Sequence, residues 1–316
     1  MIDWNPRLQY LNNRTELNCV CGRESGFVIR RRDRYGLSFR FRMCLGCGHV
    51  RNSNPPSEEA TTEFYRSSDF RTMYFNNESP SDVIRRKTPK AGSETALLRY
   101  VNRVSPSGRS IVEWGCSGGW NLVPFRDAGW ETEGFDYDRT YVSLGRSFLG
   151  LNLREIDETR VTLATIQSPD IVLLNHVLEH SRNPVSLLSE LLKFCSNQSL
   201  LIVGIPLLET IRTWHWKDFF HVAHVHYFSA SSFKYVAKQA GFDLVHADIR
   251  KGLFTLAPAQ VVAAPTYSRL APLKSTRYLL SGFLEPKYRV FMMIRKLLSV
   301  FRLRGPARRL KRIFQG

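Results

Sequence analysis

The stretch Ile111-Val-Glu-Trp-Gly-Cys-Ser-Gly-Gly119 decides the fold of this chain. The apolar residues at its start predict a short buried strand over 110–114, and the small residues after them predict a tight turn. Small residues allow a ligand to lie against the backbone at the carboxyl edge of a sheet. We therefore expect a ligand site where this strand ends.

A second strand, expected over 131–135, ends at an acidic residue. Asp136 lies 23 residues after Glu113 (136 − 113). This spacing is close to the ~20 residues that separate the glycine turn of dinucleotide-binding folds from the acid that accepts the ribose hydroxyls. We therefore expect Asp136 to bind a ribose.

Strands and helices alternate on both sides of this pair. Apart from these two strands, we expect strands over 170–174, 199–205 and 242–247, and helices over 94–104, 120–128, 141–149, 184–194 and 229–240. This βαβ series predicts an α/β fold with a mainly parallel sheet and helices on both faces. A continuous apolar run of about 18 residues is absent, which argues against a transmembrane helix.

The run 111–119 resembles the first motif of class I S-adenosylmethionine-dependent methyltransferases, which has an apolar pair, an acid and then Gly-x-Gly-x-Gly. Ser117 stands where the family usually has glycine. The runs DIVLLNHVLEH (170–180) and Gly204-Ile-Pro206 resemble the fourth and fifth strand motifs of the same family. The resemblance covers residues 92–250 and implies a Rossmann-like sheet and an enzyme that uses S-adenosylmethionine.

The resemblance also implies a set of cofactor-binding residues, namely Glu113, Gly115, Ser117, Gly119, Asp136, Asp157 and Asn175. Asp157 is expected to bind the adenine amino group, with an ordinary surface acid as the alternative. Another nucleotide-binding fold is the competing interpretation of the glycine turn. Gly-x-Ser-x-Gly followed by Trp120 differs, however, from the Gly-x-Gly-x-x-Gly of nicotinamide enzymes.

Four of the six cysteines form two close pairs near the N-terminus, Cys19-x-Cys21 and Cys44-x-x-Cys47. The N-terminus lacks the apolar run of a secretory signal, so we expect metal binding in preference to disulfides. Four thiolates can hold one tetrahedral zinc ion, and two short strands between the pairs are typical of a zinc ribbon. His49 is an alternative ligand, and free thiols are the alternative to a metal site.

The cysteine run and the residues after it resemble bacterial methyltransferases with a zinc-binding N-terminal segment, many of them associated with surface glycans and modified sugars. The resemblance implies a structural zinc ion, because four thiolates leave no open coordination position.

Four of the eight histidines fall within residues 213–229, after the strand ending near Pro206. An imidazole at this edge of the sheet can deprotonate a hydroxyl or a carbon acid. His224 matches the family pattern His-x-x-Tyr-Phe-Ser and is the first candidate for a general base, with His221 as the second. His221 and Ala223 replace the Tyr and Glu of related sugar C-methyltransferases, which favours O-methylation.

Two other interpretations of these histidines stay open. The imidazoles can cap the helix that starts near Ser229 or pack under the loop. Alternatively, His221, His224 and His226 form a metal site.

The net charge of +17 is concentrated at the C-terminus. Residues 250–316 hold 15 basic residues and one acid, and residues 287–314 have the spacing of a basic amphipathic helix. Such a helix can lie on an anionic membrane surface. Packing on the enzyme and binding to nucleic acid are the alternatives.

We therefore expect four segments: a zinc-ribbon-like cysteine module (1–57), a connection (58–91), the methyltransferase domain (92–250) and a basic C-terminal extension (251–316). The expected function is methylation of a sugar, nucleotide sugar or surface-glycan precursor in the cytoplasm, with peripheral contact at the inner membrane face. An rRNA or tRNA methyltransferase and a catalytically inactive binding protein are the alternatives, and nucleic acid is the less favoured partner. The oligomeric state stays open.

Overall fold

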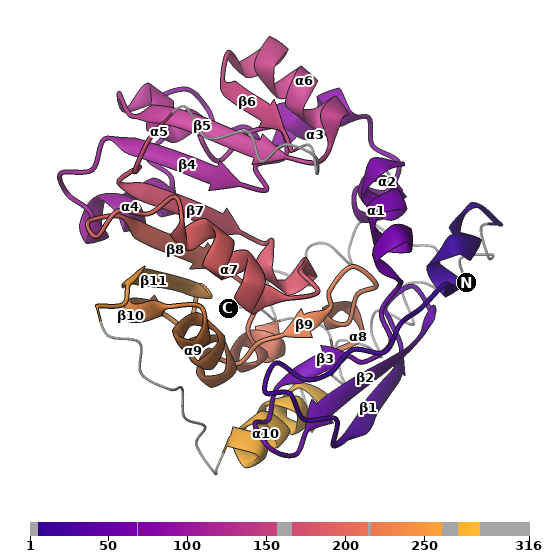
Figure 1. The fold of residues 1–316 in the computed structure, drawn as a ribbon. Helices are drawn as coiled ribbons and strands as arrows, with labels where there is room; N and C mark the ends of the chain where they lie inside the picture. The colour runs from indigo at the N-terminus through magenta and orange to yellow at the C-terminus, as the bar shows by residue number, and fades with distance from the viewer. Residues whose placement is uncertain (1–5, 68, 157–165, 214–215, 261–270, 285–316) are drawn as a thin grey trace.

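The computed structural model describes residues 6–67, 69–156, 166–213, 216–260 and 271–284 (Figure 1). Two sheets organise these residues, one of seven strands and one of four. Asp157 and the amphipathic stretch 287–314 lie outside the described residues, so the expectations for them stay predictions.

The larger sheet has the α/β topology expected from the sequence. Its strands are β4 (Ser110–Trp114), β5 (Glu131–Asp136), β6 (Asn152–Glu155), β7 (Ile171–Asn175), β8 (Leu200–Gly204), β10 (Phe242–Asp248) and β11 (Leu253–Pro258). Their spatial order is β10-β11-β8-β7-β4-β5-β6. β4 pairs in parallel with β5 and β7, and β11 runs antiparallel to β8 and β10. The mainly parallel, Rossmann-like sheet is thereby confirmed.

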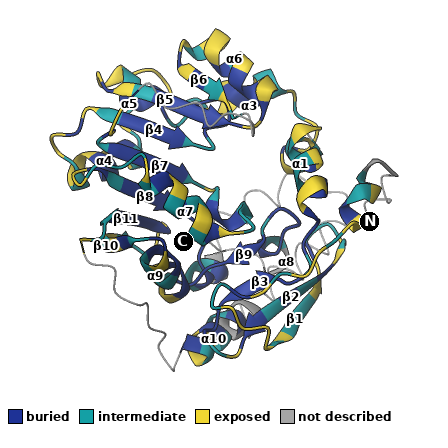
Figure 2. Cartoon of the chain, in the orientation of Figure 1, coloured by how far each residue is buried: buried dark blue, intermediate teal, exposed yellow. Residues whose placement is uncertain are grey.

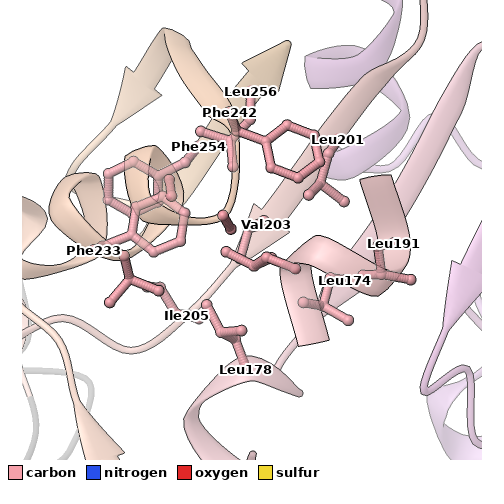
Figure 3. Close-up of a cluster of buried hydrophobic side chains, with 14 of the residues drawn as sticks. Leu174, Leu178, Leu191, Leu201, Val203, Ile205, Phe233, Phe242, Phe254 and Leu256 are labelled. Carbon is pink, nitrogen blue, oxygen red and sulfur yellow. The ribbon is translucent and has the colours of Figure 1, made fainter. Parts of the chain in front are cut away.

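Helices cover both faces of this sheet, and the side chains of the central strands alternate between them. These helices are α4 (Ala96–Val104), α5 (Val123–Asp127), α6 (Arg139–Leu149), α7 (Pro184–Leu192) and α9 (Ala230–Gln239). On β7, Val172 and Leu174 pack with α7 and α9, whereas Ile171 and Leu173 pack with α4 and α5. A strand buried on both faces is continuously apolar, as the sequence 171–174 is. Figure 3 shows the core on the α7 and α9 side.

Two helix starts show how local sequence sets these boundaries. The side chain of Ser229 accepts a hydrogen bond from Ser232 N and forms a capping box for α9. The helix expected over 120–128 begins only at Val123, with Pro124 in its first turn. Proline has no N–H to give and therefore suits the first turn of a helix. Residues 120–122 belong to the turn that precedes it.

The smaller sheet combines N-terminal strands with a strand from the histidine-rich loop. Its members are β1 (Gly26–Arg32), β2 (Ser38–Cys44), β3 (Val50–Asn52) and β9 (His226–Tyr227), in that spatial order and antiparallel. We call these strands and the cysteines beside them the N-terminal module. A further helix, α10 (Ala271–Leu284), packs on it, and Ala271 O would lie 2.5 Å from a Cβ at Gly48.

The packing crosses two of the expected segment boundaries. β9 lies in one sheet with strands from before residue 57, and β11 extends the larger sheet beyond residue 250. One hydrophobic cluster joins Phe41 of β2, Phe220 of the histidine-rich loop and Leu279 of α10. In Figure 2, β3 and β9 have the dark blue of buried residues.

Short elements connect the two sheets. They are η1 (Pro6–Asn12), α1 (Glu58–Arg66), α2 (Asp69–Tyr74), α3 (Pro80–Lys87), η2 (Leu178–His180), η3 (Leu208–Thr213) and α8 (Trp216–Phe219). Figure 1 shows α1 and α2 running between the larger sheet and the N-terminal module. Within the described residues, the helices are too short or too polar to span a membrane.

Replacing Gly119 by alanine is expected to destabilise the protein by about 2–4 kcal/mol, because strain and overpacking add. Gly119 has a φ of +79°, and a Cβ there would lie 2.7 Å from Leu151 Cδ1 and 3.0 Å from Leu153 Cδ1. Urea unfolding measures the loss. The matched control is Gly129→Ala, with a φ of +82° and nothing within 4 Å of its Cβ. It should lose only about 1–2 kcal/mol, and equal losses in both variants would contradict the packing role.

Candidate active site

A cavity of about 940 Å³ lies at the carboxyl ends of β4, β5 and β7. β4 is the topological switch point of the sheet. From it, β5 and β6 are added on one side, whereas β7 and β8 are added on the other side. Open α/β sheets bind ligands at such a switch point. The cavity extends from the glycine-rich turn to the histidine-rich loop, and residues of α1 and α2 line it between these ends.

A hydrogen bond from the turn to the neighbouring strand shapes the sheet end of the cavity. Ser117 has a φ of +55°, which is uncommon for a residue with a side chain. Its N–H donates to Asp136 Oδ2 at 2.7 Å, and Asp138 N–H donates to Asp136 Oδ1 at 2.9 Å. The Asp136 carboxylate therefore holds the turn after β4 and is itself oriented by two backbone donors.

The structure brings four of the expected cofactor residues to the cavity and places two behind its wall. Those that line it are Gly115, Ser117, Asp136 and Asn175. Glu113 is fully buried and accepts a hydrogen bond at 2.7 Å from Asn121 Nδ2, and Asn121 does line the cavity. Gly119 faces Leu151 and Leu153 and serves the packing of the turn.

Arg71 of α2 is a cavity residue that the sequence did not indicate. Its guanidinium lies 3.7 Å from Asp136 Oδ2 and 3.4 Å from Asp138 Oδ2, and stacks over the ring of Tyr141 at 4.8 Å. Its side chain is 16% exposed, so the ion pairs are partly shielded from water. Residues 66–91 carried no motif, and only the fold brings this cation to the strand ends.

His224 lies at the other end of the cavity among several rings. Its imidazole is 4.8 Å from that of His180 and 5.1 Å from that of His221. Burial, together with these two neighbouring histidines, lowers the pKa of His224 well below its ordinary value. His224 is therefore neutral at neutral pH and has a lone pair that can accept a proton.

His221 lies beside His224 but has a hydrogen-bond partner for each of its ring nitrogens. Its Nδ1 accepts the N–H of Ala223 at 2.9 Å, so the proton is assigned to Nε2, which faces the Tyr35 hydroxyl at 3.4 Å. Burial also lowers the pKa of His221 well below its ordinary value. Both ring nitrogens of His221 thus have a partner, although the residue lines the cavity.

His226 and His49 form a buried pair in the N-terminal module. His226 Nδ1 lies 2.9 Å from His49 Nε2, and each residue is at most 1% exposed. Burial lowers the pKa of His226 to about 4. His226 therefore faces His49, not the two imidazoles at the cavity. His49 in turn engages its Nε2 with His226, and the four sulfur atoms that lie together are those of the cysteines alone.

The motif run after β7 also contributes to the cavity. Glu179 is fully buried, and its Oε1 lies 3.3 Å from His176 Nδ1. His180 Nδ1 lies 2.9 Å from Ala223 O and 3.1 Å from the Tyr65 hydroxyl. The sequence marked this run as a family motif, but only the fold shows that it meets α1 and the histidine-rich loop.

The four clustered cysteines converge in the N-terminal module. All four sulfur atoms lie within 4.8 Å of one another, with Cys19 and Cys47 at 3.4 Å and Cys21 and Cys44 at 3.7 Å. Sulfur atoms around a tetrahedral zinc ion lie about 3.8 Å apart, given Zn–S bonds of about 2.3 Å. The N–H of Gly46 also donates to Cys44 Sγ at 3.3 Å, which suits a thiolate. The set is compatible with zinc.

Comparisons with known proteins bear on residues 90–247, which match a family model described as a methyltransferase domain. Curated proteins give no match. Similar solved structures include magnesium protoporphyrin IX methyltransferase from Synechocystis with bound SAH, at 13% identity and a TM-score of 0.46, covering 64% of this chain and 100% of that one.

Two further structures are similar to this chain at a comparable level. One is the sugar N-methyltransferase KedS8 from Streptoalloteichus, with 13% identity, a TM-score of 0.43 and coverage of 57% of this chain and 92% of that one. The other is the CcbJ methyltransferase from Streptomyces caelestis, with 14% identity, a TM-score of 0.41 and coverage of 54% and 91%.

Replacing Glu113 by glutamine is expected to remove a loss of folding stability that occurs as the pH rises from about 5 to about 8. Burial raises the pKa of Glu113 from its ordinary 4.5 to about 8, despite the hydrogen bond from Asn121 and with help from Asp136. Between these two pKa values, the Glu113 carboxyl is ionised in the unfolded chain and still protonated in the folded chain. Folding stability then falls, by up to about 1.4 kcal/mol per pH unit.

Glutamine stays neutral and keeps the acceptor for Asn121. Urea unfolding from about pH 5 to about pH 8 should therefore show a shallower decline for Glu113→Gln than for the unmodified protein. The exposed Glu131, replaced in the same way, is the control and should leave the decline unchanged. Identical profiles for all three proteins would contradict the raised pKa.

Proposed function

Because the chain belongs to the methyltransferase family and is an S-adenosylmethionine-dependent enzyme, we propose that it methylates a hydroxyl of a sugar, nucleotide sugar or glycan precursor. One observation carries this proposal. A single cavity connects the glycine-rich turn after β4 with a buried, neutral imidazole, that of His224. Methyl transfer to a hydroxyl needs both a cofactor site and a group that accepts the hydroxyl proton.

The glycine-rich end of the cavity suits the cofactor, which supplies a methyl group on a positively charged sulfur. Gly115 has no side chain to obstruct a ligand, and its φ of +78° requires glycine. Asp136 uses one lone pair of each oxygen on a backbone N–H. The second lone pair of each oxygen is left to accept a ribose hydroxyl.

The opposite end suits a polar acceptor with a sugar ring. The rings of Tyr65, Phe70 and Tyr74 line the cavity from α1 and α2, and Phe219 lines it from α8. Aromatic faces pack well against the C–H faces of sugars. His224 Nδ1 is buried and lacks a hydrogen-bond partner among the described residues. An acceptor hydroxyl would satisfy this atom and give it a proton to accept.

Basic side chains favour a phosphorylated acceptor, such as a nucleotide sugar. Arg34, Arg66, Lys87 and Arg182 line the same cavity. Arginine and lysine bind phosphate oxygens through charge-assisted hydrogen bonds. Together with the aromatic walls, they match a molecule that has both a sugar ring and a diphosphate.

In the same proposal, Cys19, Cys21, Cys44 and Cys47 hold a structural zinc ion. Zinc would join the loop before β1 to the turn between β2 and β3 and so brace β3. β3 pairs with β9, two residues after His224. The ion would therefore stabilise the histidine-rich loop without taking part in methyl transfer. Contact between residues 287–314 and an anionic membrane surface stays a prediction.

Replacing Asp136 by alanine is expected to weaken binding of S-adenosylhomocysteine by about 10- to 100-fold, the range for losing hydrogen bonds to a charged group. Isothermal titration calorimetry measures the affinity. The control is Asp243→Ala, an exposed acid of β10 whose partner is Lys238. Unchanged affinity in folded Asp136→Ala protein would exclude this carboxylate from the cofactor site.

Replacing His224 by glutamine is expected to slow methyl transfer to a hydroxyl acceptor by about 10²- to 10⁴-fold, because general-base catalysis contributes that much. The affinity for S-adenosylhomocysteine should not change. A screen of nucleotide sugars with labelled S-adenosylmethionine provides the assay. His246→Gln is the matched control, since His246 is exposed on β10 and its ring contacts Tyr100. A rate that survives in His224→Gln would rule out its role in proton transfer.

A further inference from the structure

Three side chains at the histidine end of the cavity bring potential metal ligands together. Glu179 and His180 lie in η2 after β7, and His224 lies in the turn before β9. One ligand atom from each lies within 4.8 Å of the others. His180 Nε2 is 4.0 Å from Glu179 Oε1. Ligands that bind one ion at about 2.1 Å lie up to about 4.2 Å apart, so small side-chain movements would close the set around an ion.

Two atoms of this group are buried without a hydrogen-bond partner. Glu179 has no exposed surface, and its Oε2 has no donor among the described residues. His224 Nδ1 is in the same situation. The ionic contacts of Glu179 within the described chain are with His176 and His180, not with lysine or arginine. A buried carboxylate is costly unless it is paired or coordinates a metal, so a cation bound here would stabilise the ionised Glu179.

The orientation of His180 matches that of a metal ligand. Its Nδ1 lies 2.9 Å from the carbonyl oxygen of Ala223, so this nitrogen carries the proton. The lone pair is then on Nε2, the nitrogen that faces Glu179. Metal-binding histidines characteristically donate their other N–H to a carbonyl or carboxylate in this way.

The neighbouring histidines hold the group in place without joining it. His176 Nδ1 lies 3.3 Å from Glu179 Oε1 and orients the carboxylate. His221 stacks on His224 at 5.1 Å, while its own nitrogens are engaged with Ala223 and Tyr35.

We propose that Glu179, His180 and His224 bind one divalent transition-metal ion at the acceptor end of the cavity, separate from the cysteine cluster. Two imidazoles and one carboxylate suit zinc, iron, cobalt or manganese better than magnesium or calcium, which prefer oxygen ligands. Three protein ligands leave coordination positions open toward the cavity.

Where the ion is bound, it would replace His224 as the group that activates the acceptor hydroxyl in the proposed function. Bound at the open positions, an acceptor hydroxyl would be polarised and its pKa lowered. His224 would then act as a metal ligand, and the hydroxyl proton would pass to solvent. This role rests on the proposed function, whereas binding of the ion does not.

Cobalt titration of metal-free, full-length protein tests the site. Cobalt held by thiolates shows intense sulfur-to-metal charge-transfer bands, and cobalt held by nitrogen and oxygen does not. We expect the protein to bind one equivalent of cobalt per chain that does not contribute to these bands. Glu179→Gln, His224→Gln and His180→Asn should each weaken this binding at least about tenfold, since even losing a partner of a ligand costs about that much. The asparagine keeps a donor for the Ala223 carbonyl.

His246→Gln controls for adventitious binding by an exposed histidine and should leave this equivalent unchanged. Cys44→Ser with Cys47→Ser should remove only the charge-transfer bands. An unchanged affinity for S-adenosylhomocysteine confirms that a variant is folded. If Glu179→Gln does not fold, the cobalt affinity of His224→Gln decides the test. Cobalt bound only with thiolate bands, or bound equally by the three variants and the unmodified protein, would overturn the proposal. Cobalt binding without methylation of any sugar would instead refute the proposed function.

Discussion

The pairing of β3 with β9 is the interaction on which the arrangement of the site depends. It sets Val50 opposite Tyr227 and Arg51 opposite His226. From β9, the Tyr227 hydroxyl accepts the N–H of His221 at 2.9 Å and donates to its carbonyl oxygen at 3.1 Å. The loop that carries His221 and His224, both of which line the cavity, is therefore held by the sheet of the N-terminal module.

The cavity combines two kinds of constraint. At the sheet end, backbone donors orient a carboxylate, and Asp136 in turn holds Ser117 in a left-handed conformation. At the histidine end, burial keeps imidazoles neutral, because desolvation disfavours their charged form. Polar groups with incomplete hydrogen bonding gather there, and such groups mark places where a ligand, an ion or a substrate completes the structure.

Local signals predicted five of the seven strands of the larger sheet and gave no range for β6 or β11. The strand over 110–114 and the turn after it agree with the structure, because apolar residues and glycines act over a few neighbours. The helix expected from residue 120 began later, since Pro124 favours the first turn. The motif also placed Asp136 and Ser117, which lie at adjacent strand ends. It could not show that Glu113 acts through Asn121 or that Gly119 faces Leu151, because such contacts depend on packing.

The sequence by itself determined the α/β fold, the family, the glycine-rich turn with its acid and the existence of a cysteine cluster and a histidine-rich loop. Each of these features is determined by a short run of neighbouring residues. Only the tertiary structure decided which imidazoles share the cavity, that Arg71 reaches Asp136, and that Glu179, His180 and His224 converge. These groups come from β-strand ends, a connecting helix and a loop far apart in the chain. Their distances are set by how β3 and β9 pair and how α1 and α2 close the space between the two sheets.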